Sequence, residues 1–107
     1  MNNVMSWSIF VMAAVLEIGG DAVIRKGLRS SGLLLIAAGF IMLGCYGLVV
    51  NSVKWDFSRL LGVYVSFFAV ITIVVSRVFL KESVSASTWI GMAVIVCGGL
   101  IIQFGQR

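Results

Sequence analysis

Four long stretches of the sequence contain no charged side chain. They cover residues 1–16, 30–53, 60–76 and 83–106. A helix that rises about 1.5 Å per residue needs roughly 20 residues to cross a hydrocarbon core of about 30 Å, so each stretch marks one membrane span. The chain is also 61% hydrophobic and only 11% charged, a composition that soluble domains do not have. The sequence therefore predicts an all-α integral membrane protein with four transmembrane helices.

The four helices are expected to form a single domain that covers residues 1–107. We place them at about 5–24, 32–53, 58–80 and 85–104, between the charged residues. Trp7, Trp55 and Trp89 each lie near a predicted helix end, where an amphipathic ring prefers the headgroup region. We interpret these three tryptophans as interface anchors and give them no role in a site.

The charges of the chain indicate a lipid partner. The net charge is +4, but the basic residues are spread over the short loops and the C-terminus. Membrane lipids are therefore the expected partner, and nucleic acid is not. With four spans, one side of the membrane holds five basic residues and the other holds three: Arg25, Lys26, Arg29, Arg77 and Lys81 against Lys54, Arg59 and Arg107. This bias mildly favours both termini outside and leaves insertion in both orientations open.

The sequence has no motif of an enzyme, a metal site or a cofactor site. It contains no His, and Cys45 and Cys97 lie in separate apolar stretches without CxxC spacing. The pair Gly19 and Gly20 lacks the strand-turn-helix context of a phosphate-binding loop. We therefore expect no metal, no cofactor and no enzymatic activity.

The strongest candidate for a functional residue is Glu17, in the first predicted helix. It lies ten residues after Trp7, which places its carboxylate about 15 Å below the interface and close to the membrane midplane. An ionised acid there costs roughly 2.5–3.5 kcal/mol even on the mildest scale, and such residues tend to mark ion, proton or substrate paths. A carboxylate that holds either a proton or a cation is the minimal part of a proton-coupled exporter. The alternative is a structural acid that a neighbouring hydroxyl satisfies.

Two further charges follow Glu17 on the same helix face. Asp21 comes four residues later and Arg25 eight residues later, so the three side chains form a ladder. Asp21 is a second candidate for binding protons or substrate. The alternative is an ion pair between Asp21 and Arg25 near the headgroups, with the Arg25 side chain reaching toward water.

Small and aromatic residues could complete a pocket around Glu17. Ala13 and Gly20 leave space on its helix face, while Tyr46, Tyr64 and Phe68 supply hydroxyl groups and rings from the second and third helices. Aromatic rings attract organic cations, and the tyrosine hydroxyls add hydrogen bonds. Tyr64 is the aromatic residue that we place in the substrate site, and the other four are pocket candidates.

The fourth predicted helix carries a pair of glycines, Gly91 and Gly98, at a spacing of seven residues. This spacing places both on one helix face, where small residues allow a neighbouring helix to approach closely. The spacing does not decide whether that neighbour comes from the same chain or from another. Because four helices hardly surround a solute path, a dimer with an eight-helix bundle is the simpler arrangement.

Several of these segments, in this order, resemble the small multidrug resistance family of the drug/metabolite transporter superfamily. They are Leu16-Glu17-Ile18-Gly19-Gly20, the basic Arg25, Gly62-Val63-Tyr64, Ile90-Gly91-Met92 followed by Gly98, and the turn Phe79-Leu80-Lys81-Glu82, which is similar to the Phe-Leu-Gly-Glu turn of that superfamily. The resemblance covers almost the whole chain. Phe68 stands where the family has a small, flexible residue, and Asp21 is an additional acid.

The resemblance implies a multi-pass exporter of the bacterial inner membrane that works as a homodimer, often antiparallel. Protons and substrate would share the two copies of Glu17 in alternation, Tyr64 would face the substrate, and Gly91 and Gly98 would lie in the dimer seam. The expected function is proton-coupled export of small cationic or hydrophobic compounds, including metabolites, by alternating access. The alternative is an accessory subunit, or one that flips lipid carriers, in the same superfamily.

Overall fold

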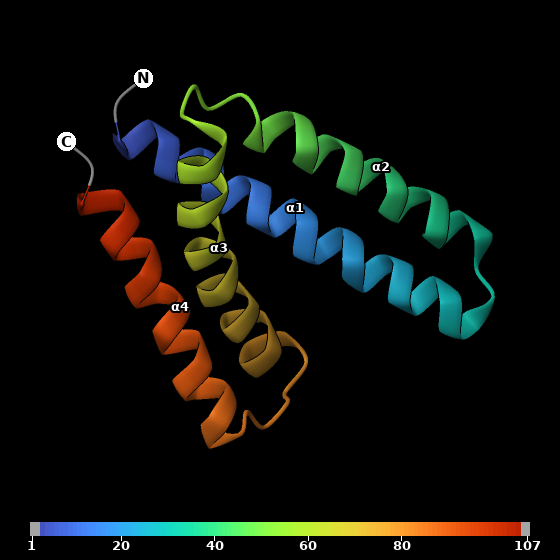
Figure 1. Ribbon diagram of the computed structural model, residues 1–107. Helices are drawn as coiled ribbons and strands as arrows, with labels where there is room; N and C mark the ends of the chain where they lie inside the picture. The colour runs from blue at the N-terminus through green and yellow to red at the C-terminus, as the bar shows by residue number, and fades with distance from the viewer. Residues whose placement is uncertain (1–2, 106–107) are drawn as a thin grey trace. The chain divides into compact units, whose positions relative to one another are not determined.

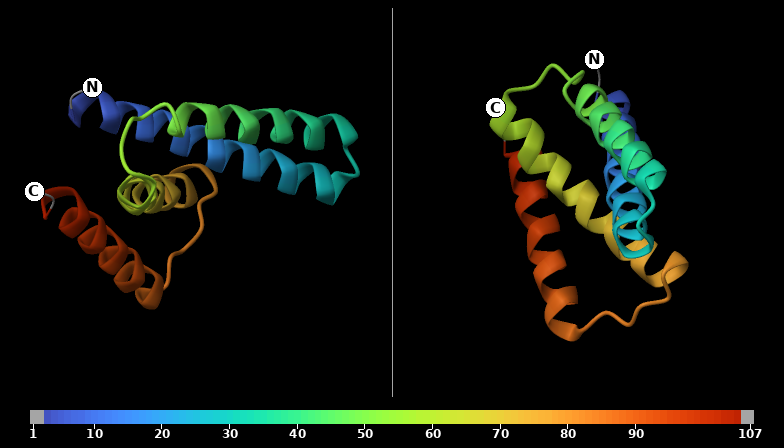
Figure 2. Two further views of the ribbon diagram at one scale, coloured as in Figure 1. Left: turned by 45° about the horizontal axis from the view of Figure 1, so that its top comes forward. Right: turned by 90° about the vertical axis from the view of Figure 1, so that its right-hand side faces the viewer.

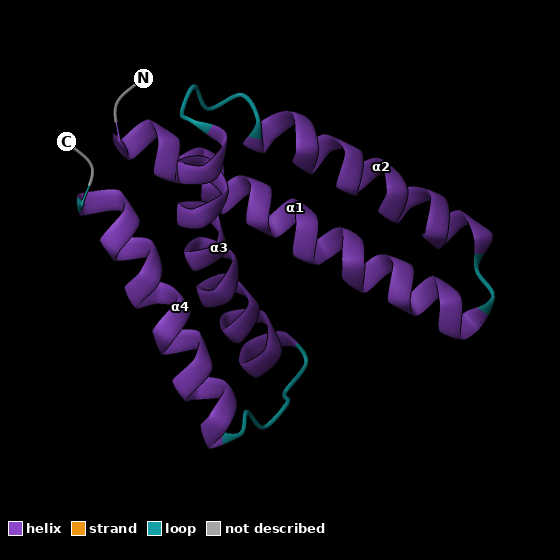
Figure 3. Cartoon of the chain, in the orientation of Figure 1, coloured by secondary structure: helices purple, strands orange, loops and turns teal. Residues whose placement is uncertain are grey.

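The computed structural model of the protein describes residues 3–105 and shows only helices and connecting loops in that range (Figures 1 and 3). The elements are α1 (Asn3–Ser30), α2 (Leu33–Val50), α3 (Phe57–Val74), the short π-helix η1 (Val75–Phe79) and α4 (Ala86–Phe104). By length and composition, α1, α2, α4 and the continuous helix Phe57–Phe79 are each able to cross a membrane. The predicted fold class, four membrane-spanning helices, is confirmed.

The chain consists of two compact units, Met1–Lys54 and Trp55–Arg107. Each unit is a helical hairpin, and we call them the first hairpin (α1 and α2) and the second hairpin (α3, η1 and α4). Single-domain organisation over residues 1–107 stays a prediction.

Small residues hold the first hairpin together. A Cβ atom added to Gly39 would lie only 2.9 Å from the carbonyl oxygen of Gly20, and one added to Gly20 would lie 3.2 Å from that of Gly39. The two backbones therefore touch, as in other membrane helices that associate through small residues. Ser6, Ala13, Gly20 and Gly27, seven residues apart, are all buried in α1 and form one stripe along the helix.

Helix α1 ends six residues later than the sequence predicted. We expected its end at residue 24 because Arg25 and Lys26 follow, but the helix continues to Ser30. Arg and Lys are good helix formers, and both side chains are exposed, so they do not stop the helix. The end comes at Ser31, whose backbone is left-handed with φ of 57°, and the Gly32 amide donates a hydrogen bond of 2.8 Å to the Gly27 carbonyl.

The second hairpin is tightly packed at one end. The Ser66 hydroxyl of α3 donates a hydrogen bond of 3.1 Å to the carbonyl oxygen of Ile95 in α4. A Cβ atom on Gly99 would collide with Ser66, and one on Gly62 would collide with Ile102. Glycine on each helix thus allows close approach in this region.

The other end of the second hairpin is looser. The α-helical part of α3 ends at Val74, short of the predicted end at residue 80, and the wider η1 follows to Phe79. The Glu82 amide then donates to the Ser76 carbonyl at 2.9 Å, and Lys81 has a left-handed backbone with φ of 55°. Helix α4 begins after Ser85, whose side chain accepts a hydrogen bond from the Thr88 amide. The right-hand view of Figure 2 shows α3 and α4 diverging toward this connection.

Candidate functional site

The centre of the candidate site is Glu17, which lies half-buried near the middle of α1. Three residues later, Gly20 brings the α1 backbone into close contact with Gly39 of α2, so Glu17 lies within one helical turn of a close contact between the two helices. This close backbone contact fixes the position of Glu17 along the axis of α1 relative to α2. It therefore lies within a packed pair of membrane helices.

Tyr46 is the predicted pocket residue that the first hairpin brings to Glu17. The two residues lie on helices that pack against each other, and both side chains are half-buried. The helix register places Tyr46 on the same part of the hairpin. Gly20 faces Gly39, and the two helices run in opposite directions. Tyr46 lies seven residues after Gly39, so it comes opposite the stretch of α1 that contains Ala13 and Glu17. A carboxylate beside a phenolic hydroxyl can hold a proton or a bound cation while the hydroxyl donates or accepts a hydrogen bond.

Ala13 and Gly20, the predicted small residues of the pocket, are both buried in α1. The side of Gly20 that faces α2 has no room for a ligand, because an added Cβ would lie 3.0 Å from the Leu43 side chain. Gly20 therefore serves helix packing, and its role in a pocket stays a prediction, as does that of Ala13.

Asp21 and Arg25 continue along α1 from Glu17 and are both exposed. Their exposure gives the ladder two accessible charges beyond the half-buried acid. The proposed ion pair between them, and a direct role of Asp21 in binding, stay predictions.

The two aromatic residues predicted from the third span lie together in α3. The rings of Tyr64 and Phe68 have centroids 6.3 Å apart and an interplanar angle of 57°, which is a favourable tilted arrangement. Tyr64 is buried and Phe68 is half-buried. Phe68 therefore supports the Tyr64 ring, so it acts at least as a packing partner for the aromatic residue that we assign to the substrate site.

The glycines of α4 fall on two different faces. A Cβ atom on Gly91 or Gly98 would meet nothing within 4 Å, whereas one on Gly99 would collide with Ser66 of α3. The packing within the second hairpin thus uses Gly99, and the face with Gly91 and Gly98 is left open. The sequence did not allow us to single out Gly99 and Ser66 as the contact between these helices. The available signal was the doublet Gly98–Gly99, which puts small residues on two neighbouring faces of α4.

Comparison with known proteins identifies relatives along the whole chain. Residues 3–107 match the model of a family described as "Uncharacterised BCR, YnfA/UPF0060 family". A UPF0060 membrane protein of Saccharopolyspora erythraea is 34% identical over 103 residues, covering 92% of each chain. One from Mycolicibacterium gilvum is 33% identical over 108 residues, covering 97% of this chain and 98% of the relative.

A third relative shows that the similarity extends to other bacteria. The UPF0060 membrane protein of Staphylococcus carnosus is 35% identical over 101 residues, covering 92% of this chain and 94% of its own. No solved structure matches the chain significantly. The family model and these full-length similarities agree with the four apolar helices, and the chain belongs to the YnfA/UPF0060 family of membrane proteins.

Proposed function

We propose that the protein is a proton-coupled exporter of small cationic or hydrophobic compounds in the bacterial inner membrane. The observation that supports this most directly is Glu17, a half-buried carboxylate in the middle of a membrane helix that packs closely against α2. Acids at this depth are costly and tend to line paths for protons or substrates. The resemblance of the Glu17 segment to the small multidrug resistance family favours the same function.

In the proposed cycle, Glu17 binds a proton and a substrate cation in alternation. A cation that approaches the protonated glutamate displaces the proton, and the carboxylate then holds the cation by charge. In this proposal, the Tyr46 hydroxyl donates a hydrogen bond to the carboxylate or substrate, and Tyr64 supplies an aromatic contact. After the site opens to the other side, a new proton releases the cation. None of these three residues forms a covalent bond with the substrate.

The proposed active unit is a homodimer. Four helices enclose little space for a solute, and the face of α4 with Gly91 and Gly98 is open to a partner helix. An antiparallel pair would expose equivalent sites to both sides of the membrane. A second candidate function, an accessory or lipid-carrier flippase subunit, rests on the same open face, because it would equally accept a different four-span chain.

The experiment is proton movement across liposomes that contain the purified protein. Quaternary cations, guanidinium compounds and polyamines are added in turn, and the internal pH is followed with a fluorescent dye. We expect at least one class to drive proton flux, and we expect Glu17→Gln to abolish that flux because a neutral amide cannot exchange a proton. Asp56→Asn is the matched control, since Asp56 is an exposed acid that makes no side-chain cap bond at the start of α3.

The outcomes separate the two functions. Flux that is lost in Glu17→Gln and kept in Asp56→Asn supports the exporter. Full activity of Glu17→Gln would contradict the proposed mechanism. No flux with any compound, from protein that retains its helical circular dichroism, would instead favour the accessory or flippase subunit.

A further inference from the structure

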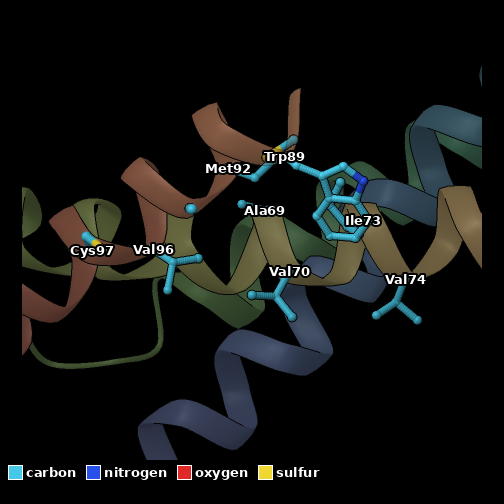
Figure 4. Close-up of a pocket in the computed structure, with 9 residues that line it drawn as sticks. Ala69, Val70, Ile73, Val74, Trp89, Met92, Val96 and Cys97 are labelled. Carbon is cyan, nitrogen blue, oxygen red and sulfur yellow. The ribbon is translucent and has the colours of Figure 1, made fainter. Parts of the chain in front are cut away.

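An apolar groove of about 570 Å³ lies between α3 and α4 of the second hairpin (Figure 4). Its walls are almost entirely aliphatic, aromatic and sulfur-containing side chains: Ala69, Val70, Ile73 and Val74 from α3, and Trp89, Met92, Ala93, Val96 and Cys97 from α4. The volume is in the range of ligand pockets. The groove begins where the close packing of Ser66 and Gly99 ends, so it occupies the diverging part of the hairpin.

The length and depth of the groove fit one leaflet of a bilayer. On α4 it runs from Trp89, near the start of the helix, to Cys97, which is about 12 Å further along the helix axis. Half of a hydrocarbon core is about 15 Å thick. If Trp89 lies at the headgroup level, as its position at the helix start indicates, the groove ends close to the midplane. An extended acyl chain of a lipid in that leaflet covers the same depth.

Basic residues follow the headgroup end of the groove wall in the chain. Arg77, in η1, follows Val74 of the groove wall by three residues, and Lys81 lies in the connection to α4. Both side chains are exposed, and long basic side chains can reach a lipid phosphate while their stems lie along apolar surface. Glu82 is exposed beside Lys81 and partly opposes their charge.

From the apolar wall, the one-leaflet length and the exposed basic residues that follow the groove wall in the chain, we infer that this groove binds an anionic phospholipid. One acyl chain fills the space between α3 and α4, and the headgroup phosphate lies against Arg77 and Lys81. An empty groove would leave its wall without contacts on one side, and an acyl chain restores them. This inference concerns the second hairpin alone and does not depend on the exporter mechanism.

The test uses the fluorescence of Trp89 in bilayers that contain brominated lipids, because bromine on an acyl chain quenches a nearby indole. Trp7→Phe/Trp55→Phe protein is placed in liposomes with equal fractions of brominated phosphatidylglycerol or brominated phosphatidylcholine. If that variant does not fold, the Trp89 signal is taken as the difference between the wild-type protein and Trp89→Phe. We expect a preference for phosphatidylglycerol of at least about fivefold, the attraction of roughly one cation near an anionic lipid.

Charge variants establish where the preference comes from. Arg77→Gln/Lys81→Gln should remove it, Glu82→Gln should increase it, and Lys54→Gln, in the loop between the hairpins, should leave it unchanged. Equal quenching by both lipids, or a preference that survives loss of Arg77 and Lys81, would overturn the inference. Absence of quenching by either lipid would also overturn it, because protein, such as a second copy, would then fill the groove. If free inorganic phosphate abolishes the preference for phosphatidylglycerol, and this preference does not depend on the acyl chain of the lipid, the region is only an anion site.

Discussion

Lys81 has a left-handed backbone that is unusual for a lysine, as Ser31 has at the end of α1. Its φ is 55°, in the left-handed region that costs an L-residue about 1–2 kcal/mol and glycine almost nothing. The turn that the sequence resembles has glycine at this position. Because glycine also loses about 0.5–1 kcal/mol more chain entropy on folding, we expect Lys81→Gly to stabilise the protein by about 0.5–1 kcal/mol. Thermal unfolding in detergent measures the change. Lys26→Gly, inside α1, is the control and should destabilise by about 1 kcal/mol; a lower melting temperature for Lys81→Gly would contradict the account.

The residues of the candidate site could be predicted from the sequence to different degrees. Glu17 could be singled out because a charge in an apolar stretch needs a reason, and the structure shows it half-buried within α1. Its functional role stays a prediction. Its neighbour Tyr46 could only be one of several aromatic candidates, because the register between α1 and α2 depends on the contact of Gly20 with Gly39. That contact is a property of the packed pair.

At the scale of the helices, two glycines of α2 have different surroundings: Gly39 packs against α1, and Gly44 faces open space. A side chain on Gly39 would meet Ile24 and the Gly20 carbonyl of α1, whereas one on Gly44 would meet nothing within 4 Å. We therefore expect Gly39→Leu to force the helices apart and to destabilise the first hairpin by at least about 1–3 kcal/mol, the usual cost of overpacking. Gly44→Leu should leave the stability unchanged or raise it slightly, because leucine is a better helix former than glycine. Unfolding in mixed micelles, followed by circular dichroism, compares the two variants. Equal stability would show that α1 and α2 do not pack through this glycine.

The spans were predictable, but their ends and contacts were not. Hydropathy alone predicts four spans because each must be apolar over about 20 residues. It cannot predict that α1 continues through Arg25 and Lys26, because exposed charges do not interrupt backbone hydrogen bonds. Nor does it predict η1, where a wider turn ends α3. Which glycines meet another helix is decided by three-dimensional packing, as the contrast between Gly98 and Gly99 shows.

For the whole molecule, we predict that two chains assemble through the open face of α4. Gly98 is half-buried, yet the space beside it is empty, and Gly91 is exposed on the same face. A leucine side chain at position 98 would block a partner helix that packs against this face. We expect Gly98→Leu to weaken dimerisation about tenfold or more, since overpacking by about 1–3 kcal/mol changes an equilibrium constant by that order.

The dimer affinity is measured by energy transfer between fluorescently labelled chains in liposomes. The protein is diluted with lipid, and the loss of energy transfer gives the affinity. Gly44→Leu is the matched control, because it adds the same side chain at an open glycine of the first hairpin. If Gly98→Leu loses both energy transfer and substrate-driven proton flux while Gly44→Leu keeps both, the transporting unit is a dimer joined through α4. An unchanged affinity in Gly98→Leu would exclude this seam, and the pathway would then have to be enclosed through another helix face.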